Sequence, residues 1–406
     1  MHVAKRYSLE FWISGLVVLA MMFPYSPILI SSSTQPVAPA ILLLLSLASI
    51  FKVINNPVVD KLVFRLCLLF LLMCFIQIGK LLWYPFDALL LLKYFTALSF
   101  FWFGSKYLIR IKPLTLNFYL FIWALGATIQ LIFPGLLLSL VSGQEISSAG
   151  RGTASFAPEP AFFATHIGMC YLITLYKFLV KEAETRDLFY SLVLVIYSLL
   201  ISQAATGVII AIFCMTLFLL RNGNLAFTKM FLIGVTLSAI LIFMPLLLEG
   251  KRIFEIFTFF SSANFLGDQS LATRFFHIAL GVNVLLEMKL FGYSSMLFAN
   301  IGLDMFDYIP SLIYDMSLVI DPVTNGSIHS LFSNLVIDFG LVFVPIILVV
   351  LLKIIKNISI WNDGMVFQVT LYFFLFLLLL LPIPVGSPIF FSIIGLYSQS
   401  PLQSRY

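Results

Sequence analysis

Charged residues are scarce in this sequence: they make up 10% of its 406 residues, whereas 61% of the residues are hydrophobic. A soluble globular domain carries about a quarter charged residues, so this composition excludes that class. The mean hydropathy of +1.08 is typical of a membrane protein. Apolar runs recur from one end of the chain to the other, and they predict a single all-α, polytopic integral membrane domain over residues 1–406.

Motifs for common cofactors are also missing. The chain has no GxxxxGK(S/T) loop, no GxGxxG turn, no HExxH helix and no paired CxxC, so ATP-driven, nucleotide-binding and zinc-hydrolase functions have no support. We therefore expect neither a cofactor nor a metal. The net charge of +5 mostly sets topology, and we expect no nucleic-acid partner. All the cysteines fall inside apolar runs, which is typical of packing residues: Cys67, Cys74, Cys170 and Cys214.

Twelve apolar segments approach the length of about 20 residues that a helix needs to cross a bilayer. The last one is short, so the sequence predicts 11–12 transmembrane helices. A polar stretch at 202–207 is the expected tight turn between the seventh and the eighth. The segments cover residues 11–30, 37–54, 62–79, 88–109, 114–133, 161–180, 188–202, 207–220, 230–248, 331–352, 366–381 and 389–397.

The distribution of basic residues predicts the orientation, because Lys and Arg favour cytoplasmic loops. With the N-terminus in the cytoplasm, 16 of the 23 basic residues lie on the inner side, and the opposite orientation reverses that ratio. We therefore expect both termini in the cytoplasm. One large periplasmic loop, residues 249–330, then lies between the ninth and tenth spans. Loops of this length are more often functional than not.

The first candidate segment, residues 150–162, joins two apolar spans yet carries Arg151 and Glu159. Pro160 suits the first position of a helix, which puts Glu159 at the cap, beside the positive end of the helix dipole. His166 follows two turns later on nearly the same face. The arginine and the carboxylate either pair with each other at the membrane edge or form an anion site, with Glu159 as base or orienting group.

The second candidate segment lies within the large loop, where residues 271–281 predict an amphipathic helix. Arg274, His277 and Gly281 share one face of it, and Asn283 and Glu287 lie on the opposite face. The arginine either reaches lipid headgroups or is held over a pocket in the membrane. Both alternatives place this helix at the outer surface of the bilayer.

The third candidate segment opens the tenth span. Asn325-Gly326 is a turn signal, and Ser327 is a plausible helix cap. His329, Ser333 and Gly340 share a helical face, and the glycine lets another helix approach closely. The histidine is either a satisfied polar residue at a helix start or a functional group.

A carboxylate lies deeper in the same span. Asp338 is two to three turns below His329, where a charge is costly unless it is paired or protonated. Asn334, four residues earlier, is the expected partner.

These three segments resemble bacterial O-antigen polymerases of the Wzy type and, more distantly, O-antigen ligases. Arg151-Gly152-Thr153, then Phe156 and Glu159-Pro160, is similar to the polymerase pattern of an arginine, a small residue, an aromatic residue and Glu-Pro. The helix led by Arg274, which runs on to Leu290-Phe291-Gly292, resembles the shared core motif. The likeness covers residues 133–350.

The third motif resembles the ligases, because His329 and Gly340 have the histidine–glycine spacing of that family. There are departures on both sides. Ala161 stands where polymerases often have a serine, and Phe343 stands where ligases have a second glycine. The missing glycine weakens the ligase assignment, and Glu159 favours the polymerase.

The resemblance implies a GT-C-like, metal-independent glycosyltransferase in the bacterial inner membrane, with its active site facing the periplasm. It implies that a growing glycan is transferred from undecaprenyl diphosphate to a sugar hydroxyl of an incoming lipid-linked repeat unit. The bilayer and a chain-length regulator protein are the expected partners. The implied catalytic residues are His329, Glu159, Arg151 and Arg274, and the implied substrate-binding residues are Arg151, Arg274, His277, His166 and Ser330.

Two other functions remain open at this point. An O-antigen ligase uses the same donor but transfers the glycan to lipid A–core. A lipid-linked oligosaccharide flippase is expected to have related halves and a charged central cavity. The sequence has no detectable internal repeat, and its acidic and basic groups gather outside the spans.

Overall fold

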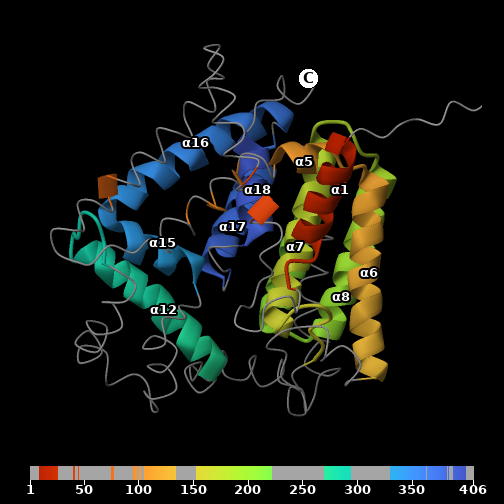
Figure 1. Ribbon diagram of the computed structural model, residues 1–406, viewed down its shortest axis with the longest axis horizontal. Helices are drawn as coiled ribbons and strands as arrows, with labels where there is room; N and C mark the ends of the chain where they lie inside the picture. Colours follow the sequence, from red (N-terminus) through yellow and green to blue (C-terminus); the bar gives the residue numbers. More distant parts are fainter. Residues whose placement is uncertain are drawn as a thin grey trace, which may run out of the picture.

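The protein is all-helical wherever its structure is described (Figure 1). The computed structural model describes residues 9–25, 40, 41, 44, 75, 76, 94, 96, 97, 100, 101, 105–133, 152–221, 269–293, 330–362, 364–381, 383 and 387–398. Four helices in these ranges are long and apolar enough to cross a membrane: 113–132, 160–179, 185–202 and 331–361. The length and composition of these helices indicate a membrane protein.

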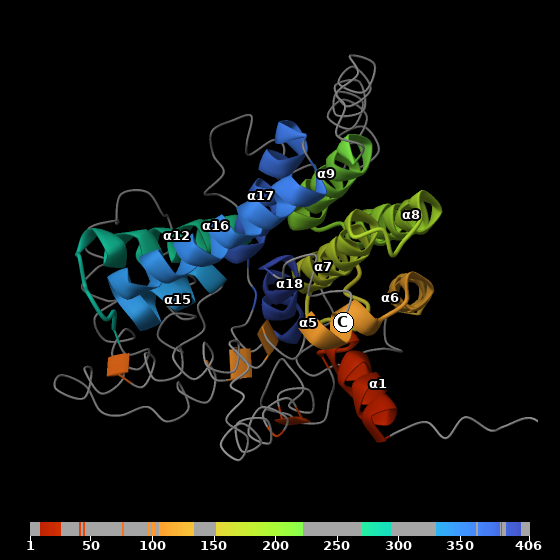
Figure 2. The same cartoon turned by 90° about the horizontal axis from the view of Figure 1, so that it is seen from above.

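The helices have the following bounds. They are α1 (Leu9–Met22), α5 (Ser105–Arg110), α6 (Pro113–Ile132), α7 (Pro160–Leu179), α8 (Thr185–Ser202), α9 (Ala205–Leu220), α12 (Gln269–Leu286), α15 (Leu331–Phe339), the 3-10 turn η4 (Gly340–Val342), α16 (Phe343–Trp361), α17 (Met365–Leu380) and α18 (Pro388–Ser398). Seen from above, α12, α15 and α16 lie on one side and α6 to α9 on the other, with α17 and α18 between them (Figure 2).

The α6–α9 half is an up-and-down helix group. Asn117 at the start of α6 donates from Nδ2 to the carbonyl of Asp187 at the start of α8, at 3.1 Å. Near the other end of the pair, the hydroxyls of Thr128 and Tyr197 are 2.8 Å apart. α6 and α8 are therefore parallel (Figure 1). α7 and α9, which short turns connect to α8, run the opposite way.

α7 is the central helix of this half, since 17 of its 20 residues are buried. Its last turn is tied to the end of α5. Lys177 donates to the carbonyl of Ile109, and its Nζ lies 2.6 Å from the Glu182 carboxylate. A buried lysine needs such partners, because an isolated ammonium inside the protein is costly. The pair therefore fixes the end of α7 that lies opposite Glu159.

Local sequence signals explain most helix ends. Proline occupies the first turn of both α6 and α7, where its missing N–H costs no hydrogen bond. A capping box starts α8, with Glu184 and Asp187 each accepting from the other's backbone N–H. Gln203 adopts the left-handed conformation that separates α8 from α9, so the tight turn predicted at 202–207 is confirmed.

The tenth predicted span, residues 331–352, is wrong in two respects. It is broken at Gly340 by η4, and its second part, α16, continues to Trp361. Gly340 has φ +59° and ψ −142°, a conformation that only glycine adopts readily. Hydropathy does not reveal the break, because the whole stretch 331–361 is apolar enough to cross a membrane.

Other predicted spans agree with the helices within a few residues. Those at 114–133, 161–180, 188–202, 207–220, 366–381 and 389–397 correspond to α6, α7, α8, α9, α17 and α18. The first is shorter than predicted, because α1 ends at Met22 and Phe23–Tyr25 are not helical. The spans predicted at 37–54, 62–79 and 230–248 lie almost wholly outside the described residues.

Candidate functional site

The segment 152–159 is held in one conformation by side chains of α6. Gln130 accepts two hydrogen bonds at Oε1, from the backbone N–H groups of Ala154 at 2.8 Å and Ser155 at 2.7 Å. Ser155 donates from Oγ to the carbonyl of Trp123 at 2.8 Å. These bonds satisfy backbone groups that a buried loop would otherwise leave unpaired. The segment that carries Glu159 is therefore fixed on the end of α6.

Two glycines allow this close fit. A Cβ on Gly152, where φ is +73°, would lie 2.1 Å from the carbonyl oxygen of Ser202. A Cβ on Gly126 would lie 2.5 Å from the ring of Phe156. The segment thus lies between α6 and the α8–α9 turn, and neither contact leaves room for a side chain.

Glu159 is at the N-cap of α7, as the sequence predicts. Its backbone is extended, Pro160 follows in the first turn, and its side chain makes no capping hydrogen bond. The side chain is exposed. The carboxylate therefore makes no capping bond and lies at the surface beside the first N–H groups of the helix, to which Pro160 contributes none.

His166 occupies a different environment from Glu159, although both belong to the start of α7. It is fully buried, its ring centroid 4.5 Å from that of Trp123 and 6.1 Å from that of Tyr25. The structure does not bring these two predicted site residues onto one exposed face. His166 instead belongs to the aromatic cluster under the 152–159 segment.

That cluster is a feature the sequence did not indicate. Phe23, Phe156 and Phe163 surround the Trp123 ring with centroids 5.7, 5.4 and 5.7 Å away. Trp123 also donates from Nε1 to the carbonyl of Met22 at 3.0 Å. It therefore joins the end of α1, α6 and the 152–159 segment. Contacts between residues this far apart in the chain leave no local pattern.

α12 packs closely on α15 through two of the predicted site positions. Ser333 donates from Oγ to the carbonyl of His277 at 2.5 Å, and a Cβ on Gly281 would lie 2.7 Å from Oγ of Ser333. His277 is fully buried, and Arg274, one turn earlier, is half-buried. The face predicted to carry Arg274, His277 and Gly281 is thus the face toward α15.

The turn that follows α12 is bonded to the break between α15 and α16. Tyr293 donates from its backbone N–H to the carbonyl of Ile337 at 2.6 Å, and Leu341 donates to that of Lys289 at 2.9 Å. A Cβ on Gly340 would lie 2.2 Å from the Lys289 oxygen and 2.3 Å from the Gly292 nitrogen. Gly340 does make a close approach, but its neighbour is this turn and not another helix as predicted.

Gly292 is the second glycine in that contact. It has φ +69°, and a Cβ on it would lie 2.3 Å from the Ile337 oxygen and 2.7 Å from the Gly340 nitrogen. The two glycines, 48 positions apart in the numbering, therefore make one backbone-to-backbone contact. We call this contact, with the α12–α15 packing beside it, the glycine junction.

Ser330 is the N-cap of α15, so the cap predicted at Ser327 is wrong for this helix. Its hydroxyl accepts from the N–H of Ser333 at 3.4 Å, and its carbonyl accepts from Nδ2 of Asn334 at 3.0 Å. Leu331 donates its N–H to the carbonyl of Leu381, which ties this helix start to the end of α17. Ser330 is fully buried.

Asp338 has a hydrogen-bond partner that the sequence did not indicate. Tyr94 donates from its hydroxyl to Oδ2 of Asp338, and its ring lies 4.4 Å from that of Phe339. Both Tyr94 and Asp338 are at most 2% exposed. The expected partner, Asn334, directs its amide to Ser330. A buried carboxylate thus connects α15 to a residue 244 positions earlier.

The predicted site residues fall into three groups. Arg274, His277 and Ser330 are joined through α12 and α15, and Glu159 and His166 belong to α7. Arg151 and His329 lie outside the described residues, each directly before a described one. In the described ranges no group of three or more His, Cys, Asp or Glu side chains is arranged to hold a metal ion.

Comparisons with known proteins leave the family open. No family model, no curated protein and no solved structure matches this chain. What the chain does must therefore be argued from its own residues.

Proposed function

We propose that this protein polymerises lipid-linked repeat units of a surface polysaccharide, as the Wzy-type O-antigen polymerases do. The observation that carries the proposal is the glycine junction. It joins two segments that resemble this superfamily, the Arg274 helix with Leu290-Phe291-Gly292 and the helix start with Gly340. The structure gives a physical reason for glycine at positions 292 and 340, because each lies in a backbone contact with no room for a Cβ.

The junction also supports a role for Arg274 in binding phosphate. Arg274 lies on a helix held by the Ser333 bond to the carbonyl of His277, one turn away. A guanidinium on a fixed helix suits the oxygens of a diphosphate leaving group, because its planar fork loses little conformational freedom on binding. Arg151, which directly precedes the fixed segment 152–159, is the proposed second cation.

The proposed reaction needs a base or an orienting group for the acceptor. A hydroxyl of the acceptor sugar attacks the anomeric carbon of the donor glycan, and the bond from that carbon to the lipid diphosphate breaks. The hydroxyl proton goes to the base, and the diphosphate leaves with the electron pair, its charge stabilised by the arginines. His329, one residue before the cap of α15, is the first candidate base. Glu159, exposed and not used for capping, is the second.

The charges at the helix ends support the proposed orientation. Lys177, Arg186 and Arg221 lie at the end of the α7–α9 group where α6 and α8 begin, and Glu159 lies at the other end. By the preference of basic residues for the cytoplasm, the first end faces inward. Glu159 and the start of α15 then face the periplasm of a bacterial inner membrane, in a GT-C-like bundle of about twelve spans.

The direct test replaces Arg274 by alanine in cells that make the polysaccharide. We expect chain extension to fall at least tenfold, because one cation opposite the diphosphate is lost, while the protein level in the membrane stays unchanged. Arg186→Ala is the matched control, because this arginine is exposed at the opposite helix end and forms an ion pair with exposed Glu184 at 3.8 Å. Normal long chains in the Arg274→Ala cells would contradict the proposal.

Deleting the gene separates this function from its alternatives. Loss of a polymerase leaves lipopolysaccharide capped by one repeat unit, and loss of a ligase leaves none capped. Loss of a flippase keeps the repeat units on the cytoplasmic side, where a membrane-impermeant label does not reach them. Only the first pattern agrees with the proposal.

A further inference from the structure

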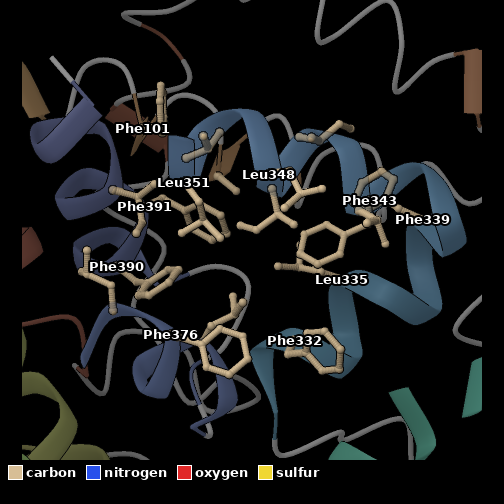
Figure 3. A pocket seen from close by; sticks show the side chains of 18 of the residues that line it. Phe101, Phe332, Leu335, Phe339, Phe343, Leu348, Leu351, Phe376, Phe390 and Phe391 are labelled. Carbon is tan, nitrogen blue, oxygen red and sulfur yellow. The ribbon is translucent and has the colours of Figure 1, made fainter. Parts of the chain in front are cut away.

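A cavity of about 400 Å³ lies between α15, α16, α17 and α18, away from the predicted site residues (Figure 3). Phenylalanines dominate the lining that Figure 3 labels, among them Phe101, Phe332, Phe376, Phe390 and Phe391. Among the described residues that line the cavity, Tyr94 alone has a polar side-chain atom, and its hydroxyl is bonded to Asp338. A water molecule or a sugar would therefore find almost no hydrogen-bond partner there.

The cavity opens sideways, between α16 and α17. Leu348 on α16 and Phe376 on α17 both line it, and they are 51% and 45% exposed. Residues lining its inner wall, such as Ala97 and Phe390, are 3% exposed. Because α16 belongs to a helix stretch apolar enough to cross a membrane, this opening faces hydrocarbon. The chemistry of the lining and the position of the opening both favour an alkyl or alkenyl chain.

The cavity shares α15 with the candidate site. Phe332, Leu335 and Phe339 line the cavity from one face of this helix, and Ser333 on another face is bonded to α12. Leu285 of α12 also lines it. An amphiphile with its tail in the cavity would thus lie against the same two helices that hold Arg274 and Ser330.

We propose that this cavity binds the polyprenyl tail of the lipid-linked donor, an inference that rests on the proposed function for the identity of the lipid. A methyl-branched, unsaturated chain suits a wall of aromatic rings, which contact its methyl groups and double bonds. The tail enters between α16 and α17, and the cavity holds part of it while the diphosphate remains at the outer end of α15.

The test measures binding without any reaction. Purified full-length protein in phospholipid nanodiscs is irradiated with an undecaprenyl phosphate that carries a photoreactive group in its tail, and the cross-linked peptides are identified by mass spectrometry. We expect cross-links on the α16 and α17 residues that line the cavity, competed by unlabelled undecaprenyl phosphate. The probe carries no sugar, so the result does not depend on whether the protein is a polymerase.

A matched pair of variants sharpens the test. Leu348→Trp places a large side chain at the opening and is expected to reduce cross-linking at least tenfold. Val349→Trp changes the neighbouring position, which is 66% exposed and does not line the cavity, and should have no effect. If Leu348→Trp fails to fold, Phe376→Trp replaces it, with Phe373→Trp as its control, since Phe373 is exposed and lies outside the lining.

Three outcomes overturn the proposal: undiminished cross-linking in the folded cavity variant, cross-links confined to residues outside the lining, or equal competition by phosphatidylglycerol. The last would identify a site for phospholipid acyl chains in general. If cells with the gene deleted showed no polymer defect, the proposed function would be refuted. The cross-linking result would remain valid in that case, because it measures lipid binding alone.

Discussion

The two halves of this protein hold their candidate site segments by different means. In the α6–α9 half, side chains hold the 152–159 segment: Gln130 bonds two of its N–H groups, and the Trp123 cluster lies under it. In the α12–α16 half, backbone lies directly on backbone at Gly292 and Gly340. The first arrangement has one such backbone contact, at Gly152, and otherwise depends on interactions worth about 1 kcal/mol each. The second depends on the absence of two Cβ atoms.

This difference predicts how each half responds to substitution. A segment held by several hydrogen bonds and ring contacts loses them one at a time, so single changes weaken it by degrees. A backbone contact without space admits no intermediate state, because the cores around it are close-packed. Substitutions of the junction glycines should therefore have larger effects than removal of one side chain that holds the 152–159 segment, where Gly152 alone makes a comparable backbone contact.

The largest effect is expected for Gly340→Ala. The positive φ alone costs a non-glycine residue about 1–3 kcal/mol, and the new Cβ would meet backbone atoms of Lys289 and Gly292 at 2.2 and 2.3 Å. We expect the variant protein to be lost from the membrane or to show a strongly lowered Tm, measured on purified protein by a thermal unfolding assay. Chain extension should disappear with it.

Gly15→Ala is the matched control for that substitution. This glycine lies within α1, and apart from the backbone of its own helix no atom of the described residues lies within 4 Å of the position of an added Cβ. Alanine favours a helix over glycine by up to about 1 kcal/mol, so this variant should be as stable as the parent or more so. If both variants behaved alike, the backbone contact at Gly340 would not be what holds the two segments together.

The sequence predicts those parts of the fold that depend on local patterns. Apolar runs located α6, α7, α8, α9, α17 and α18 within a few residues, and Pro160 located the start of α7 together with its cap, Glu159. The helical face predicted from Arg274, His277 and Gly281 identified the side of α12 that packs on α15, where His277 and Gly281 contact Ser333. Each of these inferences needs only a few neighbouring residues and a known helix period.

What the sequence does not predict depends on residues far apart in the chain. The break at Gly340 is set by the turn at Lys289–Gly292, and the partner of Asp338 is Tyr94 from an earlier helix. Gln130 carries no sign that it accepts from Ala154 and Ser155. Such pairs require the tertiary arrangement, because an apolar pattern states that a residue is buried and not what it touches.

A smaller effect is expected for Gln130→Ala. It removes the acceptor for two backbone N–H groups, and leaving a buried donor unpaired costs about 1–3 kcal/mol. Because the segment keeps its aromatic contacts, we expect the helices to stay folded while residues 153–155 exchange their amide hydrogens faster and chain extension falls severalfold. Hydrogen–deuterium exchange with mass spectrometry measures the first effect.

Gln130→Glu tests whether the acceptor itself is responsible. A carboxylate keeps an oxygen for both N–H groups, and hydrogen bonds to a charged acceptor are at least as strong as those to an amide. Exchange at 153–155 should therefore return to the parental rate. Fast exchange in both variants would show that an acceptor oxygen at position 130 is not enough to hold the segment.

The smallest effect is expected for Ser333→Ala. It removes the bond from Oγ to the carbonyl of His277, worth about 1 kcal/mol, but it leaves no orphan, because that carbonyl lies within α12 and still accepts from the helix backbone. Gly281→Ala attacks the same contact differently, since its Cβ would lie 2.7 Å from that hydroxyl oxygen and 2.9 Å from Cα of Ser333. We expect Gly281→Ala to lower the Tm clearly more than Ser333→Ala. Equal effects would mean that the hydroxyl holds α12 on α15, and the comparison between the two halves would then fail, because both would depend on single side-chain bonds.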